Sequence, residues 1–192
     1  MPRAFTDRER ERIRGALLDA GRAALPRSGM RRTSVDQLTR AAGVSKGAFY
    51  LFFDDKEALW VELLREGEAT ARALVRDALA APPELRLRRV VDAVFTAVWA
   101  DPILRILTDA EELAWLTTRL PPGALAAARA DDDLFFAEVH HALASAGLLA
   151  PDVDVNGFCA VPSAALALAQ HAIDDPVRGW VIDGLVARLG PA

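Results

Sequence analysis

The fold is decided by residues 33–59, which read TSVDQLTRAAGVSKGAFYLFFDDKEAL. Ser34 stands before a short helical pattern, and Gly43 suits the left-handed residue that ends such a helix. Ser45 suits the N-cap of a second short helix over residues 46–53. Two short helices joined by a glycine-containing turn are typical of a helix-turn-helix, so we expect that motif here.

The sequence on either side of this stretch also predicts helices. Alanine is abundant, and the chain has no convincing run of alternating β-branched residues. Proline and glycine breaks divide it into about nine helices without a repeat or a low-complexity linker. We therefore expect an all-α protein, with a three-helix helix-turn-helix domain at residues 1–53 and a second helical domain at residues 54–192.

Local signals mark where several helices begin. Capping-box spacing is predicted at three helix starts: Thr6 with Glu9, Ser34 with Gln37, and Asp54 with Glu57. The last two helices are expected at about residues 153–173 and 176–189, and Pro162 is expected to kink or interrupt the first of them. A segment around residues 103–116 is expected to be helical and broken in two.

Charge divides the chain in the same place. The 192 residues carry a net charge of −4, but residues 1–53 hold 11 Lys and Arg against 5 Asp and Glu. Residues 54–192 hold 12 Lys and Arg against 22 Asp and Glu. A basic head joined to an acidic body indicates that only the head meets a polyanion.

Composition argues against several other classes of protein. Cys159 is the only cysteine, which excludes an intrachain disulfide and a cysteine-based zinc site. The adjacent His140 and His141 point about 100° apart on a helix, so we expect no metal site and no cofactor. Residues 158–173 are too short and too polar for a membrane span, and the N-terminus has no apolar signal region, so we expect a cytoplasmic protein.

Residues 33–59 closely resemble the DNA-binding signature of TetR-family transcriptional regulators. The resemblance covers about residues 6–65 and is carried by AAGVSKG at 41–47, by Tyr50 and Phe53, and by KEAL at 56–59. It implies a bacterial homodimer that binds a palindromic operator on double-stranded DNA. It also implies a repressor that a small apolar effector releases, with activation left open.

The family pattern and the physics of recognition helices together suggest which residues contact DNA. The N-terminal residues of a recognition helix face base edges, and lysines attract phosphate. Lys46 and Lys56 are the only two lysines, and both stand at family lysine positions. The expected DNA-binding residues are Arg32, Ser34, Ser45, Lys46, Gly47, Ala48, Tyr50, Phe52 and Lys56. Because phenylalanine cannot donate a hydrogen bond, Phe52 either packs against a sugar or thymine methyl or makes no contact.

The resemblance extends to the body only as architecture. In the family the last two helices form the dimer interface, for which we expect Ala165, Leu168, Val177, Trp180, Val181 and Leu185. The alternative is that this apolar stripe closes the core of the monomer. The resemblance also implies that an effector binds between the middle helices, for which we expect the lining residues Phe95, Trp99, Trp115, Phe136, His140 and Phe158. The alternative is that these residues are core.

Two other functions remain open on the same fold. An all-helical enzyme is one, although Ser163 with His171 makes only a weak catalytic pair and no phosphate loop is visible. A protein–protein adaptor that has lost DNA binding is the other. Loss of DNA binding after Lys46→Ala, with an intact body, separates a regulator from the enzyme. Binding of the basic head to any duplex at low salt separates it from the adaptor.

Overall fold

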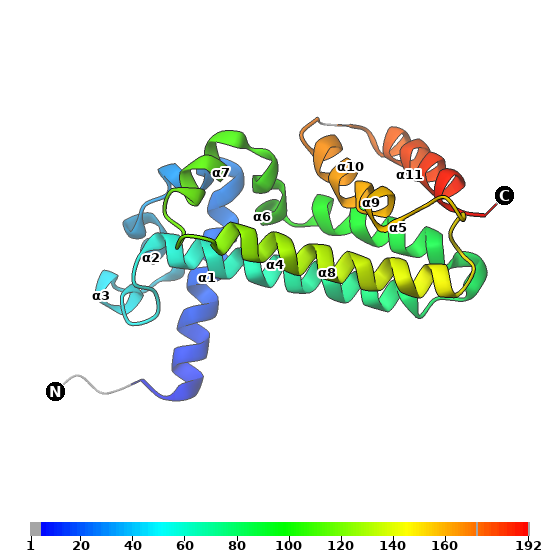
Figure 1. Cartoon of the computed structure of the whole chain (residues 1–192). Helices are drawn as coiled ribbons and strands as arrows, with labels where there is room; N and C mark the ends of the chain where they lie inside the picture. Colours follow the sequence, from blue (N-terminus) through cyan, green and yellow to red (C-terminus); the bar gives the residue numbers. More distant parts are fainter. Residues whose placement is uncertain (1–4, 172, 192) are drawn as a thin grey trace.

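The computed structural model describes residues 5–171 and 173–191, and all regular structure in these ranges is helical (Figure 1). The N-terminal helices are α1 (Asp7–Arg32), α2 (Val35–Ala42) and α3 (Lys46–Phe49). The body follows, with α4 (Lys56–Leu79), α5 (Pro83–Ala100), α6 (Pro102–Arg105), the 3₁₀ turn η1 (Ile106–Thr108), α7 (Ala110–Thr117), α8 (Ala124–Ser145), α9 (Val155–Phe158), α10 (Ala160–Ala169) and α11 (Asp175–Leu189). No helix in the described ranges is long and apolar enough to cross a membrane.

Local capping places the helix-turn-helix as the sequence predicts. Reciprocal capping boxes are present at Thr6 with Glu9 and at Ser34 with Gln37. Gly43 ends α2 with φ 67°, in the left-handed region. The Ala48 N–H donates to the Ser45 hydroxyl at 3.1 Å and starts α3. These bonds hold α2 and α3 at a fixed angle.

Three boundaries differ from the prediction. The helix expected over 46–53 ends at Phe49, and residues 50–52 form a turn. The cap of α4 is Asp55, which accepts from the Ala58 N–H at 2.7 Å, in place of the Asp54–Glu57 box. The helix expected over 153–173 divides at Cys159. Pro162 is the third residue of α10 and has no N–H to donate to the carbonyl oxygen of Phe158, the last residue of α9, so the interruption just before it agrees with the predicted effect of this proline.

Two hydrophobic cores hold the molecule together. The N-terminal core joins α1, α2 and α3 to the first two turns of α4, with Trp60 and Phe49 among its fully buried side chains. It also takes in Ile103 and Leu104 of α6 and Leu116 of α7. The second core lies within the body, between α4, α5, α8, α9, α10 and α11. Side chains of α6 and α7 therefore pack against the predicted DNA-binding domain.

Candidate nucleic-acid interface and internal cavity

The N-terminus of α3 presents an exposed polar surface. Ser45 and Gly47 are exposed, the Lys46 side chain is 57% exposed, and Tyr50 is 50% exposed one turn later. Lys46 Nζ lies 3.0 Å from Asp36 Oδ1 on α2, and the hydrogen bond with this carboxylate raises the pKa of Lys46. The lysine is therefore charged and placed at the start of the helix, as phosphate or base contact requires.

Two residues expected to meet DNA lie partly or wholly inside the domain. Ala48 is only 8% exposed, because it lies on the buried face of α3 together with Phe49. The Phe52 ring is half-buried against the N-terminal core, and the Arg10 guanidinium lies over it at 5.2 Å. Cation–π contact between Arg10 and Phe52 places a positive charge beside this turn, from a residue to which the sequence prediction gave no role.

The ammonium group of Lys56 is used within the chain. Its Nζ donates to the carbonyl oxygens of Met30, Arg31 and Thr33 at 3.2, 2.7 and 2.9 Å. It also lies 4.8 Å from the centre of the Trp115 ring. Burial lowers the pKa of Lys56. An ammonium group has three protons, and three carbonyls of the α1 end accept them, so a phosphate contact by Lys56 requires one of these bonds to break.

The end of α1 is fastened by α7. Gly29 has φ 66° and ψ 178°, a conformation that only glycine adopts readily, and it turns the last residues of α1 toward α7. The Glu112 carboxylate accepts from the Met30 N–H and the Arg31 N–H, both at 3.0 Å. A side-chain carbon at Gly29 would lie 2.3 Å from a Glu112 carboxylate oxygen. Arg32 and Ser34, just beyond this turn, are exposed.

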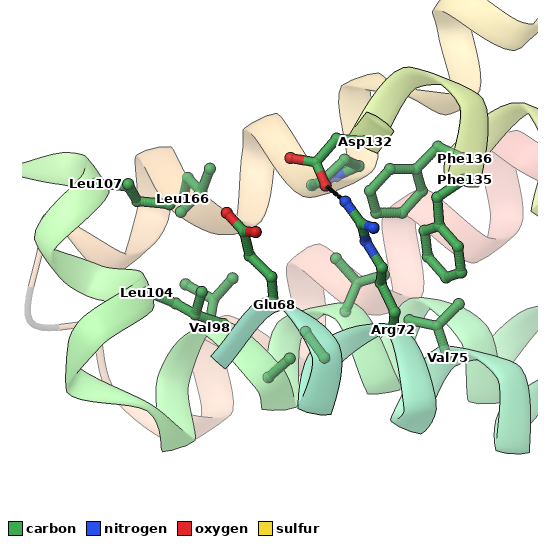
Figure 2. A pocket seen from close by; sticks show the side chains of 14 residues that line it. Glu68, Arg72, Val75, Val98, Leu104, Leu107, Asp132, Phe135, Phe136 and Leu166 are labelled. Carbon is green, nitrogen blue, oxygen red and sulfur yellow. Dashed lines mark hydrogen bonds and ion pairs between the residues drawn. The ribbon is translucent and has the colours of Figure 1, made fainter. Parts of the chain in front are cut away.

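A partly open cavity of about 100 Å³ lies between the helices of the body (Figure 2). Its wall comes from α4, α5, α6, η1, α8 and α10. The lining side chains are mainly apolar: Ala71, Val75, Val94, Ala97, Val98, Leu104, Leu107, Phe135, Phe136, Pro162 and Leu166, with Glu68, Arg72 and Asp132 as the charged ones. An apolar wall with a few converging polar groups is typical of a small-molecule site.

The structure brings one of the six expected effector residues, Phe136, to this cavity. Phe95 and Phe158 are fully buried in the body core, and Phe95 stacks on the half-buried Trp99. The other two expected residues lie elsewhere: His140, whose Nε2 is 2.9 Å from the Val153 carbonyl oxygen, and Trp115, which covers Lys56. Helical periodicity finds apolar faces but does not tell which face borders empty space. Glu68, Arg72 and Asp132 were missed because each resembles an ordinary surface charge in the sequence.

The residues expected at a dimer interface fall into three groups. Ala165 is fully buried in the core of its own protomer and is therefore unavailable to a partner. Leu168, Val181 and Leu185 are half-buried and pack against that core. Val177 and Trp180 are exposed on α11, Trp180 to 70%. This is a large apolar side chain to leave in water.

Within the described ranges, no group of three or more His, Cys, Asp or Glu side chains is arranged so that it could bind a metal ion. In the cavity, Arg72 and Asp132 form an ion pair, and Glu68 adds a second carboxylate.

Residues 17–63 match the sequence profile described as "Bacterial regulatory proteins, tetR family". The fold of the whole chain is similar to that of a tetR-family regulatory protein from Rhodococcus RHA1, with a TM-score of 0.66 and 20% identity over 97% of this chain and 100% of that one. It is also similar to the TetR-family regulator PfmR of Thermus thermophilus, with a TM-score of 0.69 and 21% identity over 89% and 97% of the two chains.

A third similar structure is the ketosteroid transcriptional regulator KstR2 of Mycobacterium tuberculosis, with a TM-score of 0.61 and 20% identity over 97% of each chain. No curated protein sequence matches this chain. The three solved structures cover 89–97% of this chain, so the similarity of fold extends over nearly its whole length.

Proposed function

We propose, from the match of residues 17–63 to the tetR-family profile and from the similar fold of solved regulators, that this chain is a TetR-family repressor which a small effector releases from a palindromic operator. The observation that carries the proposal is the double role of α4. Its first turns belong to the core of the helix-turn-helix domain, and its middle turns line the internal cavity. A ligand that moves α4 moves the DNA-binding head.

A second copy of the chain is part of this proposal. One recognition helix as short as α3 reads only a short half-site, whereas a symmetric dimer reads two half-sites spaced by about 34–36 Å. Exposed Trp180 and Val177 on α11 supply an apolar surface for the partner. The domain boundary proposed between residues 53 and 54 separates the basic head from the acidic body, although the head core continues into α4.

Release follows if the effector binds better to a conformation that does not fit DNA, because a ligand with equal affinity for both states shifts nothing. Two contacts offer the route from cavity to head. Leu104 of α6 and Leu107 of η1 line the cavity, and α7, which follows them, holds the end of α1 through Glu112. Displacing α6 and η1 therefore shifts the support on which α2 and α3 rest.

The test is selection of DNA sites by the full chain from a pool of random duplexes, followed by titration of the enriched site. We expect an enriched palindrome with half-sites about one helical turn apart. For about 6–10 phosphate contacts, affinity falls roughly 10³–10⁵-fold between 50 and 200 mM salt.

Lys46→Ala is expected to weaken binding to the selected site, while Arg129→Ala, which removes one exposed positive charge from α8, leaves it unchanged. A flat salt dependence, or no enrichment at any salt concentration, contradicts the proposal. Failure to bind any duplex at low salt favours the protein–protein adaptor instead.

A further inference from the structure

The three charged side chains of the cavity are not equivalent. Arg72 Nη2 lies 2.7 Å from Asp132 Oδ1, so the guanidinium of α4 and the carboxylate of α8 form an ion pair across the cavity (Figure 2). Glu68, one turn before Arg72 on α4, has neither a hydrogen bond nor an ion pair with any described residue. In Figure 2 its carboxylate extends toward Leu107 and Leu166, away from the Arg72–Asp132 pair. One carboxylate therefore remains without a partner in an apolar space.

The surroundings of Glu68 disfavour its negative charge. Burial is the largest cause that raises the pKa of Glu68, and the negative charge of Asp132 adds to it. Arg72 and Arg65 oppose this effect without cancelling it. With two carboxylates and one guanidinium, the ionised cavity carries an excess negative charge, and a positive group beside Glu68 relieves both the desolvation and the repulsion.

We propose that the effector is a small amphipathic cation whose positive group pairs with Glu68 and whose apolar part lies among Leu104, Leu107, Phe136 and Leu166. This inference rests on the proposed function, since it names the chemical class of the effector for the same cavity. The apolar wall accounts for the affinity, and the single carboxylate selects the charge of the head group.

An anionic effector is the alternative that Arg72 favours. Its Nε is buried and has no hydrogen-bond partner among the described residues. An anion placed on this guanidinium, however, competes with Asp132 for it and lies near the unpaired Glu68. The cavity would then hold three negative groups, Glu68, Asp132 and the anion, against the single guanidinium of Arg72. The Arg72 Nε–H is therefore better suited to an uncharged oxygen of the ligand.

Size sets a further condition on the effector. A cavity of roughly 150 Å³ holds a benzene molecule, and this cavity has about 100 Å³. A ligand with one aromatic ring and a short alkyl chain therefore exceeds this volume, and it fits if the helices around the cavity separate or if part of the ligand extends from the open side. Because α4 supplies side chains both to the cavity wall and to the core of the head, a separation that moves α4 also moves the head.

The test uses three probes with the same apolar part: 4-phenylbutylamine, 4-phenylbutan-1-ol and 4-phenylbutyrate. Binding to the full chain is measured by calorimetry in the absence of DNA. We expect the amine to bind at least about tenfold more tightly than the alcohol or the acid, as for a charge-assisted contact. Glu68→Gln is expected to weaken amine binding about tenfold and to leave alcohol binding unchanged. Asp77→Asn, which neutralises an exposed acid elsewhere on α4, leaves both unchanged.

The selectivity of the wild-type protein among the three probes tests the inference even if Glu68→Gln fails to fold. Alcohol or acid binding as tight as amine binding overturns it, as does failure of the amine to bind at millimolar concentration. Unchanged amine affinity in a folded Glu68→Gln variant also overturns it.

Parallel titrations of the selected operator separate this inference from the proposed function. Release by the acid but not by the amine contradicts the effector class and leaves the repressor standing. Selective amine binding by a chain that binds no operator contradicts the repressor alone.

Discussion

At the scale of single residues, Glu68 sets a pH dependence of stability. Its pKa is raised in the folded state by burial first and by Asp132 second, so the folded chain binds this proton more tightly than the unfolded chain. Stability is therefore lost as pH rises from the ordinary glutamate range through the folded pKa. Glu68→Gln removes this loss, and its free energy of unfolding relative to wild type is expected to increase over the same range. Denaturant unfolding between pH 4 and 8 measures it. Asp77→Asn is the control, and a pH-independent difference for Glu68→Gln contradicts the prediction.

The two lysines are expected to act differently, although both match lysine positions of the family signature. Lys56→Ala leaves three carbonyl oxygens of the α1 end without their donor and is expected to cost about 1–3 kcal/mol of unfolding free energy. Lys46→Ala removes only an exposed pair with Asp36 and is expected to leave the free energy of unfolding nearly unchanged while weakening DNA binding. Denaturant unfolding and operator titration of both variants measure the contrast. If Lys56→Ala is as stable as wild type but does not bind DNA, Lys56 is a phosphate contact instead.

At the scale of elements, α7 supports the helix-turn-helix head, which we propose binds DNA. Glu112→Ala leaves the Met30 and Arg31 N–H groups without an acceptor, and we expect a loss of about 1–3 kcal/mol. Amide hydrogen exchange at these two residues is expected to accelerate, and the effect of an effector on operator affinity is expected to shrink. Glu111→Ala is the matched control, because it removes only an exposed pair with Arg31. Equal exchange rates in the two variants would show that α7 does not hold α1.

The elements also separate what the sequence predicts from what it does not. Ser34, Gly43 and Ser45 specify α2, the turn and the start of α3 through bonds within a few residues, so the prediction of the helix-turn-helix was confirmed. The fastening of α1 by Glu112 joins residues 82 positions apart, and no local pattern marks it. The cavity also joins residues far apart in the sequence, because Glu68 and Asp132 line the same space only once α4 has packed against α8. Of the aromatic side chains predicted to line it, only Phe136 does so, whereas Phe95 and Phe158 fill the core of the body.

At the scale of the whole molecule, part of the positive charge of the head is neutralised by ion pairs with the acidic body. Arg14 and Arg22 of the basic head pair with Glu62 and Glu66 of α4. These pairs fasten α1 to the acidic body and leave less positive charge for DNA than the composition suggests. We therefore expect the exposed cations of the head, among them Lys46 and Arg32, to weigh more in operator binding than their number indicates.

Assembly is the remaining prediction at this scale, and it concerns Trp180. A side chain that is 70% exposed on α11 gains most from a partner surface, and buried tryptophans at interfaces commonly contribute about 2 kcal/mol or more, or about 30-fold in dissociation constant. Trp180→Glu is expected to shift the chain toward monomer in sedimentation equilibrium and to weaken binding to a two-half-site operator far more than to a single half-site. Leu134→Glu is the control, since it places the same charge at a comparably exposed residue on α8. If Trp180→Glu stays dimeric while Leu134→Glu dissociates, the interface lies on α8 and the assignment to α11 is wrong.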